Sequence, residues 1–172
     1  MGRHIQHLKV GDTLKLKGPW KKLEVTPNKY KSIGMVAGGT GLTPMLQVIN
    51  EVIGNGDDDT KMTLIYGNQT PSDILLRSKL DELAAAHPNH LKVVYTVDRP
   101  TKGWSGETGF VTAEMVRKHL PSSQHANTMI MVCGPPPMMN GLCGPKGPKG
   151  SQGEIGGVLK DVGFTIDQCY KF

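Results

Sequence analysis

Short apolar runs alternate with longer amphipathic stretches along the chain after Lys31. The runs are rich in β-branched and other apolar residues, which is typical of buried strands, and they cover residues 33–37, 62–66, 91–97 and 129–133. Apolar residues at helical spacing predict helices over 43–53, 73–86 and 112–120, the last with Thr112 as its N-cap. This alternation predicts right-handed βαβ units, and therefore an α/β fold with a doubly wound parallel sheet.

Residues 1–28 do not follow this alternation. In the stretch 8–19, apolar and basic positions alternate around a Gly11-Asp12 turn, which predicts one or two strands of an antiparallel structure. This stretch is too short to close a domain of its own. We therefore interpret residues 1–28 as the end of a preceding domain and residues 29–172 as the α/β domain.

Glycine occurs at every third position between residues 144 and 156. This spacing resembles that of collagen, but about four triplets are too few to form a triple helix beside a globular core. We expect a flexible surface loop over residues 144–157.

Composition narrows the functional classes. The chain has 172 residues, enough for about one domain, and 37% of them are hydrophobic, which argues against extensive disorder. No apolar run approaches the length of about 20 residues that spans a bilayer, so any membrane anchor must lie outside this chain. The three cysteines form no C-x-x-C pair, which suits a reducing compartment. No H-E-x-x-H is present, and we expect no metal site.

The positive charge is concentrated at one end. Residues 1–31 contain eight Lys or Arg and two acids, a net charge of +6 in a chain whose total is +5. This segment is either a solvated strand face or a docking surface for an acidic partner protein. Nucleic acid is a weaker interpretation, because no recognised nucleic-acid-binding module accompanies the charge.

The most informative motif is Ala37-Gly38-Gly39-Thr40-Gly41-Leu42-Thr43-Pro44-Met45, which follows a predicted strand and opens a predicted helix. Glycines let a backbone approach a phosphate closely, and the free N–H groups of a helix N-terminus favour an anion. Thr43 suits the N-cap and Pro44 the first helical position. The alternative is a tight strand–helix turn with no ligand.

A second motif, Cys133-Gly134-Pro135-Pro136-Pro137-Met138, follows the strand predicted at 129–133. Its prolines make a stiff wall with few hydrogen-bond donors, suited to hold a flat group. Cys133 is a buried structural thiol, a nucleophile or a contact to a ring. No His or Lys is next to it in the sequence to lower its pKa, which disfavours the nucleophile.

Together these two motifs, about 90 residues apart, resemble the NADH-cytochrome b5 reductase family within the ferredoxin-reductase-like flavoenzymes. The resemblance extends over nearly the whole chain, including Tyr66-Gly67-Asn68-Gln69-Thr70, Tyr95-Thr96-Val97-Asp98-Arg99-Pro100 and the ending at Phe172. It implies that the α/β domain is Rossmann-like and binds NADH, and that residues 1–28 are a remnant of an antiparallel FAD-binding barrel. The flavin-dependent part of nitrate reductase shares both motifs and is the alternative.

The resemblance also implies roles for individual residues. Residues 38–41 would contact the pyrophosphate of NADH, Thr43 would face the flavin, and residues 133–136, with Met138, would hold the nicotinamide. Cys133 and Thr43 would therefore be the catalytic residues. Asp98 would bind the adenosine ribose and favour NADH over NADPH. Phe172 would lie at the cofactors, and Gly2, Arg3 and His4 match a flavin-phosphate motif of the form G-[KR]-x-S, in which Ile5 replaces the Ser.

The implied reaction is hydride transfer from NADH to FAD, followed by one-electron transfer to cytochrome b5 or a similar acidic haem protein. The family's flavin motif, Arg-x-Tyr-[ST], is absent from this sequence. The chain is therefore a fragment or truncated product, or else an NADH-binding module without catalysis. Intact members lie on the cytosolic side of the endoplasmic reticulum or outer mitochondrial membrane, and we expect this chain to be a soluble cytoplasmic monomer.

Overall fold

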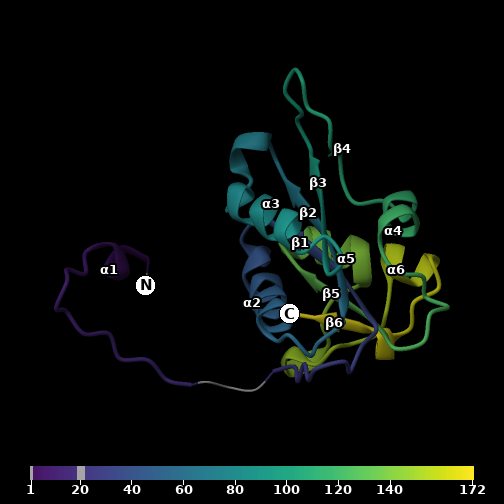
Figure 1. The fold of residues 1–172 in the computed structure, drawn as a ribbon, viewed down its shortest axis with the longest axis horizontal. Coiled ribbons are helices and arrows are strands. Elements are labelled where there is room, and N and C mark those ends of the chain that lie inside the picture. The colour runs from purple at the N-terminus through teal and green to yellow at the C-terminus, as the bar shows by residue number, and fades with distance from the viewer. Residues whose placement is uncertain (1, 19–21) are drawn as a thin grey trace.

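Six parallel strands form one sheet in the order β4-β3-β2-β1-β5-β6 (Figure 1). The computed structural model describes residues 2–18 and 22–172. The strands are β1 (Ser32–Gly38), β2 (Lys61–Asn68), β3 (Leu91–Val97), β4 (Glu107–Thr108), β5 (Thr128–Cys133) and β6 (Cys169–Lys171). The α-helices are α1 (Gly2–Gln6), α2 (Leu42–Gly54), α3 (Arg77–Ala86), α4 (Ala113–His119), α5 (Pro136–Cys143) and α6 (Gly157–Asp161). Short 3₁₀ turns occur at Gly39–Gly41, Pro71–Asp73, Pro148–Gly150 and Ile166–Gln168.

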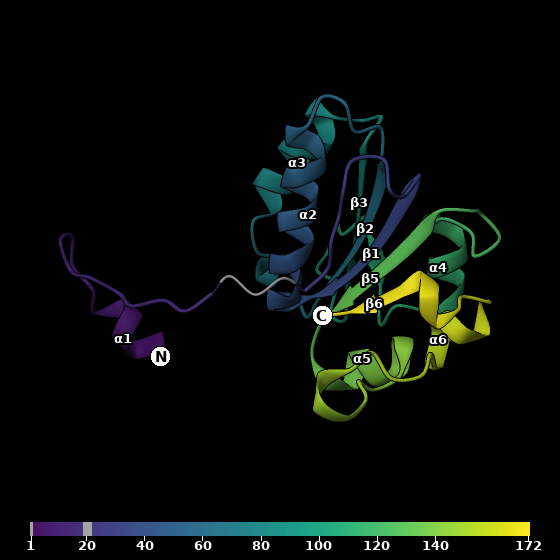
Figure 2. The same cartoon turned by 90° about the horizontal axis from the view of Figure 1, so that it is seen from below.

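Helices cover both faces of this sheet, because successive strand residues point to opposite sides. On one face, residues such as Met35 and Leu64 pack with α2 and α3. On the other face, neighbours such as Val36 and Ile65 pack with α4, α5 and α6. Figure 2 shows the two helical layers on either side of the strands. The predicted doubly wound α/β fold is confirmed.

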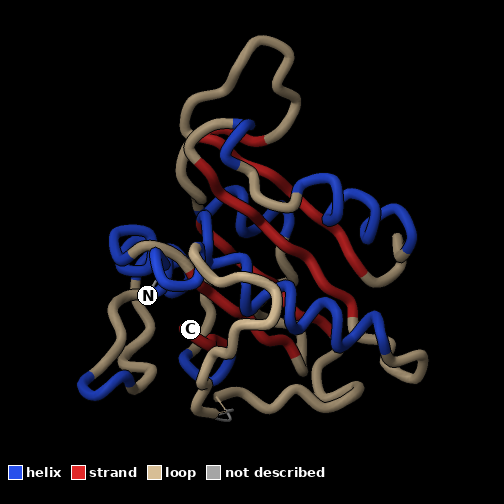
Figure 3. The backbone as a smooth tube through the Cα atoms, turned by 90° about the vertical axis from the view of Figure 1, so that its left-hand side faces the viewer, coloured by secondary structure: helices blue, strands red, loops and turns tan. Residues whose placement is uncertain are grey.

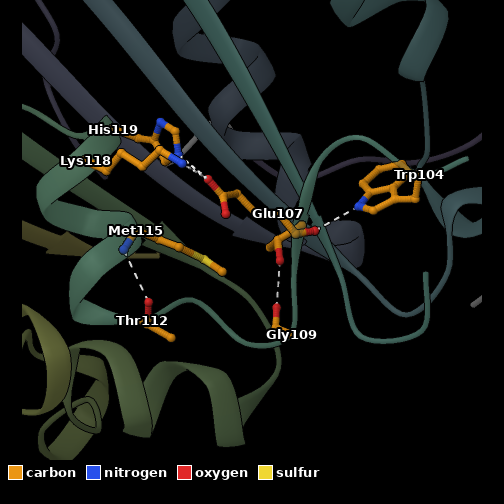
Figure 4. Close-up of polar contacts among 8 residues, drawn as sticks. Trp104, Glu107, Gly109, Thr112, Met115, Lys118 and His119 are labelled. Atoms are coloured by element: carbon orange, nitrogen blue, oxygen red, sulfur yellow. Dashed lines mark hydrogen bonds and ion pairs between the residues drawn. The ribbon is translucent and has the colours of Figure 1, made fainter.

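The predicted strands agree with β1, β2, β3 and β5, whereas the predicted starts of α2 and α3 were wrong. Helix α2 begins at Leu42 rather than at residue 43. The helix expected from residue 73 begins at Arg77, because Asp73 instead accepts a hydrogen bond from the Thr70 backbone N–H (2.9 Å), and Leu76 adopts a left-handed backbone with φ of 55°. The predicted cap of α4 is confirmed, since the Thr112 hydroxyl accepts a hydrogen bond from the Met115 N–H (Figure 4).

The antiparallel strands predicted at residues 8–19 are not formed in the part that the structure describes, residues 8–18; Pro19 lies outside it. A strand needs a partner for its backbone hydrogen bonds, and this segment has none to pair with. Residues 2–18 instead form α1 and an irregular segment that extends away from the sheet (Figures 1 and 2). Leu23 and Val25 already pack against the core of the α/β unit, so contacts with this unit begin before residue 29.

At the outer edge of the sheet, Glu107 connects the short strand β4 to α4 (Figure 4). Its carboxylate accepts hydrogen bonds from Lys118 Nζ (2.8 Å) and pairs with His119 Nε2 (2.7 Å), and its carbonyl accepts one from Trp104 Nε1 (2.9 Å). These side-chain hydrogen bonds hold the pKa of Glu107 below its ordinary value. The connection from β3 to β4 protrudes beyond the sheet (Figures 1 and 3).

The glycine-rich segment 144–157 is a surface loop, as predicted, and its three-residue spacing has a structural reason. Glycines at equal distances from the tip meet across the loop: a Cβ on Gly144 would lie 3.2 Å from the nitrogen of Gly156, and one on Gly153 would lie 2.8 Å from that of Gly147. The loop therefore closes on itself, backbone against backbone.

Lys171 holds the base of this loop. Its side chain is fully buried, and Nζ donates hydrogen bonds to the carbonyl oxygens of Pro145 (3.0 Å) and Glu154 (2.7 Å). The side-chain amide of Gln152 bonds both the N–H and the C=O of Lys171. The expectation of a freely flexible loop did not include these bonds, because nothing in the local sequence indicates them.

Among the residues that the structure describes, no helix is long and apolar enough to cross a membrane.

Replacing Lys171 with Met should destabilise the protein by about 1–3 kcal/mol, because Met fills a similar volume but leaves two carbonyl oxygens without a donor. Lys160→Met, on the exposed side of α6, should change the free energy of unfolding by less than about 0.5 kcal/mol. Urea unfolding of both variants measures the difference. Equal stabilities would mean that the Lys171 bonds contribute nothing.

Candidate nucleotide-binding cleft

The strand order reverses between β1 and β5, and this reversal opens a cleft. After β1 the chain continues into α2 on one face of the sheet, and after β5 it continues into α5 on the other face (Figure 2). Two loops therefore leave neighbouring strands in opposite directions. This is the place in a doubly wound sheet where ligands bind.

The cleft has a volume of about 1030 Å³. Most of the predicted site residues line it: Gly38, Gly39, Thr40, Gly41, Thr43, Asp98, Cys133, Gly134, Pro135 and Met138. Further lining residues come from the ends of β2 and β3, from the segment after β4 and from α5 and α6: Gly67, Asn68, Gln69, Thr96, Gly109, Phe110, Val111, Pro137, Gly141, Leu142 and Val158.

The remaining predicted site residues are not among those that line the cleft. Pro44 and Pro136 lie in the first turns of α2 and α5. Phe172 follows β6 at the carboxyl ends of the strands. Its N–H donates a hydrogen bond to the Val132 carbonyl (3.0 Å), and its ring meets that of Tyr170 edge-on. Gly2, Arg3 and His4 belong to α1, apart from the sheet (Figures 1 and 2).

Three glycines let the two loops pack against each other. A Cβ on Gly41 would overlap the carbonyl oxygen of Cys133, and a Cβ on Gly38 or Gly134 would lie 2.5 or 2.7 Å from the sulfur of Met138. Gly39 differs, because it has a left-handed φ of 52° and open space around the position of a Cβ. Gly41 is thus required for the backbone contact between the loops, and Gly38 and Gly134 leave room for the Met138 side chain beside that contact, roles that the sequence reasoning missed.

Helix α2 begins earlier than predicted. The N-cap was expected at Thr43 and the first helical position at Pro44, whereas Gly41 precedes a helix that starts at Leu42. The reason is the 3₁₀ turn Gly39–Gly41, which leads directly into α2. The exposed Thr43 hydroxyl donates to the Thr40 carbonyl (3.2 Å), and Pro44 still falls in the first turn, where a missing N–H leaves no intrahelical bond unmade.

Cys133 is the last residue of β5 and is half-buried at the cleft. Burial raises the pKa of its thiol, an effect that the positive charge of Lys146 only partly opposes. At neutral pH the group is therefore a neutral thiol, which makes it a poor nucleophile.

Asp98 follows β3, and its exposed side chain lines the cleft. The neighbouring Arg99 donates a hydrogen bond from Nη2 to Gln69 Oε1 (2.8 Å). Among the ion pairs formed by the described residues, none joins Arg99 to Asp98. Arg99 is therefore not paired with the carboxylate that lines the cleft.

Asn68 and Phe110 are cleft residues that the sequence reasoning did not assign. The amide nitrogen of Asn68 is buried without a hydrogen-bond partner in the described structure, a state that calls for a ligand or water as acceptor. The Phe110 ring is 82% exposed although it is aromatic. Their positions after β2 and β4 were the available signal, since ligands gather at the carboxyl ends of parallel strands.

The described residues contain no group of three or more His, Cys, Asp or Glu that could hold a metal ion.

A comparison with known families matches a region that contains all the residues lining the cleft except Val158. A family model described as the oxidoreductase NAD-binding domain matches residues 35–144. The NADH-cytochrome b5 reductase-like protein of Arabidopsis thaliana is 50% identical over 172 residues, which are 100% of this chain and 52% of that protein. NADH-cytochrome b5 reductase 2 of Scheffersomyces stipitis is 45% identical, over 100% of this chain and 57% of that protein. The chain thus spans little more than half the length of these relatives.

Solved structures agree with this relationship. The cytochrome b5 reductase domain of Ulva prolifera nitrate reductase has a TM-score of 0.85 and 38% identity, over 99% of this chain and 62% of that one. The CS-b5R domains of human Ncb5or share the fold, with a TM-score of 0.76 at 22% identity. These similarities confirm the resemblance that the two loops indicated.

Replacing Gly41 with Ala should destabilise the protein by about 1–3 kcal/mol, because the added methyl group collides with the Cys133 backbone. The φ of −62° at position 41 is compatible with Ala, so the effect is steric. Gly54→Ala, at the end of the same helix and in open space, is the control and should be neutral or stabilising by up to about 1 kcal/mol. Urea unfolding compares them; equal free energies for both variants would contradict the loop contact.

Proposed function

Because the chain belongs to the family of oxidoreductase NAD-binding domains, we propose that its cleft binds NADH and presents the nicotinamide to a flavin for hydride transfer. The observation that carries this proposal is the contact of the two loops at the strand-order reversal, which leaves a cleft open to a dinucleotide. The unpaired Asn68 amide and the open space at Gly39 also fit a ligand with many acceptor oxygens.

We assign the pyrophosphate to residues 38–41. Two features support this assignment: these residues line the cleft, and they lead into the N-terminus of the 13-residue helix α2. The unpaired N–H groups and the dipole of such a helix stabilise negative charge.

The nicotinamide is assigned to residues 133–136, with Met138 beside them and Thr43 in the first turn of α2. When bound, NADH supplies the hydride from its nicotinamide ring. Prolines at 135 and 136 restrict the backbone, so the wall of the cleft is fixed before the ligand binds. The raised pKa of the Cys133 thiol supports a positioning contact with the ring and argues against a covalent intermediate.

The adenosine half is assigned to the carboxyl ends of β3 and β4. The Asp98 carboxylate can accept hydrogen bonds from ribose hydroxyls, and the exposed Phe110 ring offers a face on which adenine can stack. A 2′-phosphate beside Asp98 would be repelled, so we propose a preference for NADH over NADPH.

The flavin is the less complete part of the proposal. Gly2, Arg3 and His4 match a flavin-phosphate motif but lie in α1, so the described residues do not assemble a flavin site around the cleft. This observation favours a second candidate function, a module that binds NADH without retaining FAD.

For the electron acceptor, we propose cytochrome b5 or a similar acidic haem protein, because the reductases that this chain resembles are named for cytochrome b5. The exposed side chains of Lys9, Lys15 and Lys17 support this, since they present positive charge to an acidic surface. Lys21, which adds to the same charge in the sequence, lies outside the described residues. A nitrate-reductase-like enzyme is the alternative, favoured by the Ulva prolifera structure.

We also propose that this chain by itself acts as a soluble, cytoplasmic monomer. For the intact family, the resemblance implies the cytosolic side of the endoplasmic reticulum or outer mitochondrial membrane.

Calorimetric titration of the chain with NADH, together with its visible flavin absorbance after purification, tests the function. Binding of NADH without flavin absorbance supports the NADH-binding module. Flavin absorbance that NADH bleaches supports the reductase. A chain that binds no NADH contradicts both.

Replacing Asp98 with Ser should improve binding of NADPH relative to NADH by about ten- to a hundredfold, because the substitution removes a negative charge facing the 2′-phosphate. The dissociation constants of both nucleotides, measured on the parent and the variant, give this ratio. Asp161→Ser, an exposed acid in α6, is the control and should leave the ratio unchanged. If the parent already prefers NADPH, Asp98 does not set the preference.

A further inference from the structure

A tyrosine beneath the first loop is bonded to the loop's backbone. Tyr66, in β2, is fully buried on the face covered by α2 and α3. It lies opposite Ala37 of β1, two residues before Gly39. Its hydroxyl donates a hydrogen bond of 2.9 Å to the carbonyl oxygen of Gly39. Strand β2 thus holds the loop that follows β1, its neighbour in the sheet.

This bond orients a peptide group that lines the cleft. In a trans peptide the carbonyl of Gly39 and the N–H of Thr40 point in opposite directions. A carbonyl held toward Tyr66 therefore directs the Thr40 N–H away from the core. Gly39 has a left-handed φ of 52° and open space around the position of a Cβ. Its carbonyl also accepts a hydrogen bond from the Leu42 N–H within the same turn, so Tyr66 adds the contact that ties this peptide to the sheet.

The hydroxyl keeps its proton under all ordinary conditions. Burial raises the pKa of Tyr66 above its ordinary value. A neutral phenol is a hydrogen-bond donor, which is what the Gly39 carbonyl needs.

We propose that Tyr66 is a positioning residue for the pyrophosphate of NADH: its hydroxyl fixes the Gly39–Thr40 peptide so that the backbone N–H groups of the loop face the phosphates. This proposal rests on the proposed binding of NADH in the cleft. It adds a residue that touches no ligand and acts through the loop, and that the lining of the cleft does not include.

Tyr95 provides a matched comparison. It pairs with Tyr66 in the register of β2 and β3, and the two ring centroids are 6.4 Å apart. Its hydroxyl donates to the Asp81 carboxylate of α3 (2.7 Å) instead of to the loop. Removing this second hydroxyl perturbs a neighbouring strand but leaves Gly39 untouched.

The experiment compares Tyr66→Phe with Tyr95→Phe. Phe keeps the ring and its packing, and the Gly39 carbonyl still accepts a hydrogen bond from the Leu42 N–H, so Tyr66→Phe should fold. Calorimetry on the full chain measures the affinities for NADH and, as a probe without phosphates, for adenosine. We expect Tyr66→Phe to weaken NADH binding by about three- to tenfold and to leave adenosine binding unchanged. Tyr95→Phe should change neither.

Each other result has a definite meaning. NADH affinity equal to that of the parent, or a loss of equal size for NADH and adenosine, overturns the positioning role. A Tyr66→Phe chain that does not fold, judged by circular dichroism, also overturns it, because the hydroxyl would then be needed for folding itself. If the parent chain binds adenosine but not NADH, the proposed function itself is wrong. The titration of the parent chain alone shows this, so that outcome is distinguished from a failure of the Tyr66 proposal.

Discussion

Strands β1 and β5 lie side by side, yet the chain leaves them toward opposite faces of the sheet. The two departing loops stay in contact because position 41 has no side chain, which lets its backbone lie against the Cys133 carbonyl. Everything else about the cleft depends on this contact. It sets the separation of the loops, and Thr43 and Cys133 both line the cleft between them.

Much of this arrangement could be predicted because it depends on local sequence. Buried parallel strands are apolar on both faces, so β1, β2, β3 and β5 are visible as short apolar runs. The rule that ligands lie where strand order reverses then brings Gly39, Asp98 and Cys133 to one edge of the sheet. Neither step requires knowledge of any distant contact.

The parts that could not be predicted depend on partners far away in the chain. Gly41 was interpreted as a phosphate contact, although its small size is required by Cys133, 92 residues later. The order in segment 144–157 comes from Lys171, whose burial no local pattern indicates. The strands predicted at residues 8–19 failed for another reason: their alternation is real, but residues 8–18 pair with no strand of the described structure.

Two buried side chains hold loops beside or beyond the cleft without lining it. Tyr66 of β2 bonds the cleft residue Gly39, and Lys171 of β6 bonds the loop after α5, which lies outside the lining. Both donors bond backbone carbonyls, so they fix peptide orientation without adding a side chain to the cavity. Such an arrangement suits the proposed binding of NADH, since a cofactor that carries the chemistry needs surroundings of fixed geometry. The neutral thiol of Cys133 fits the same proposal, because a thiolate at that position would introduce reactivity that binding and positioning of the cofactor do not require.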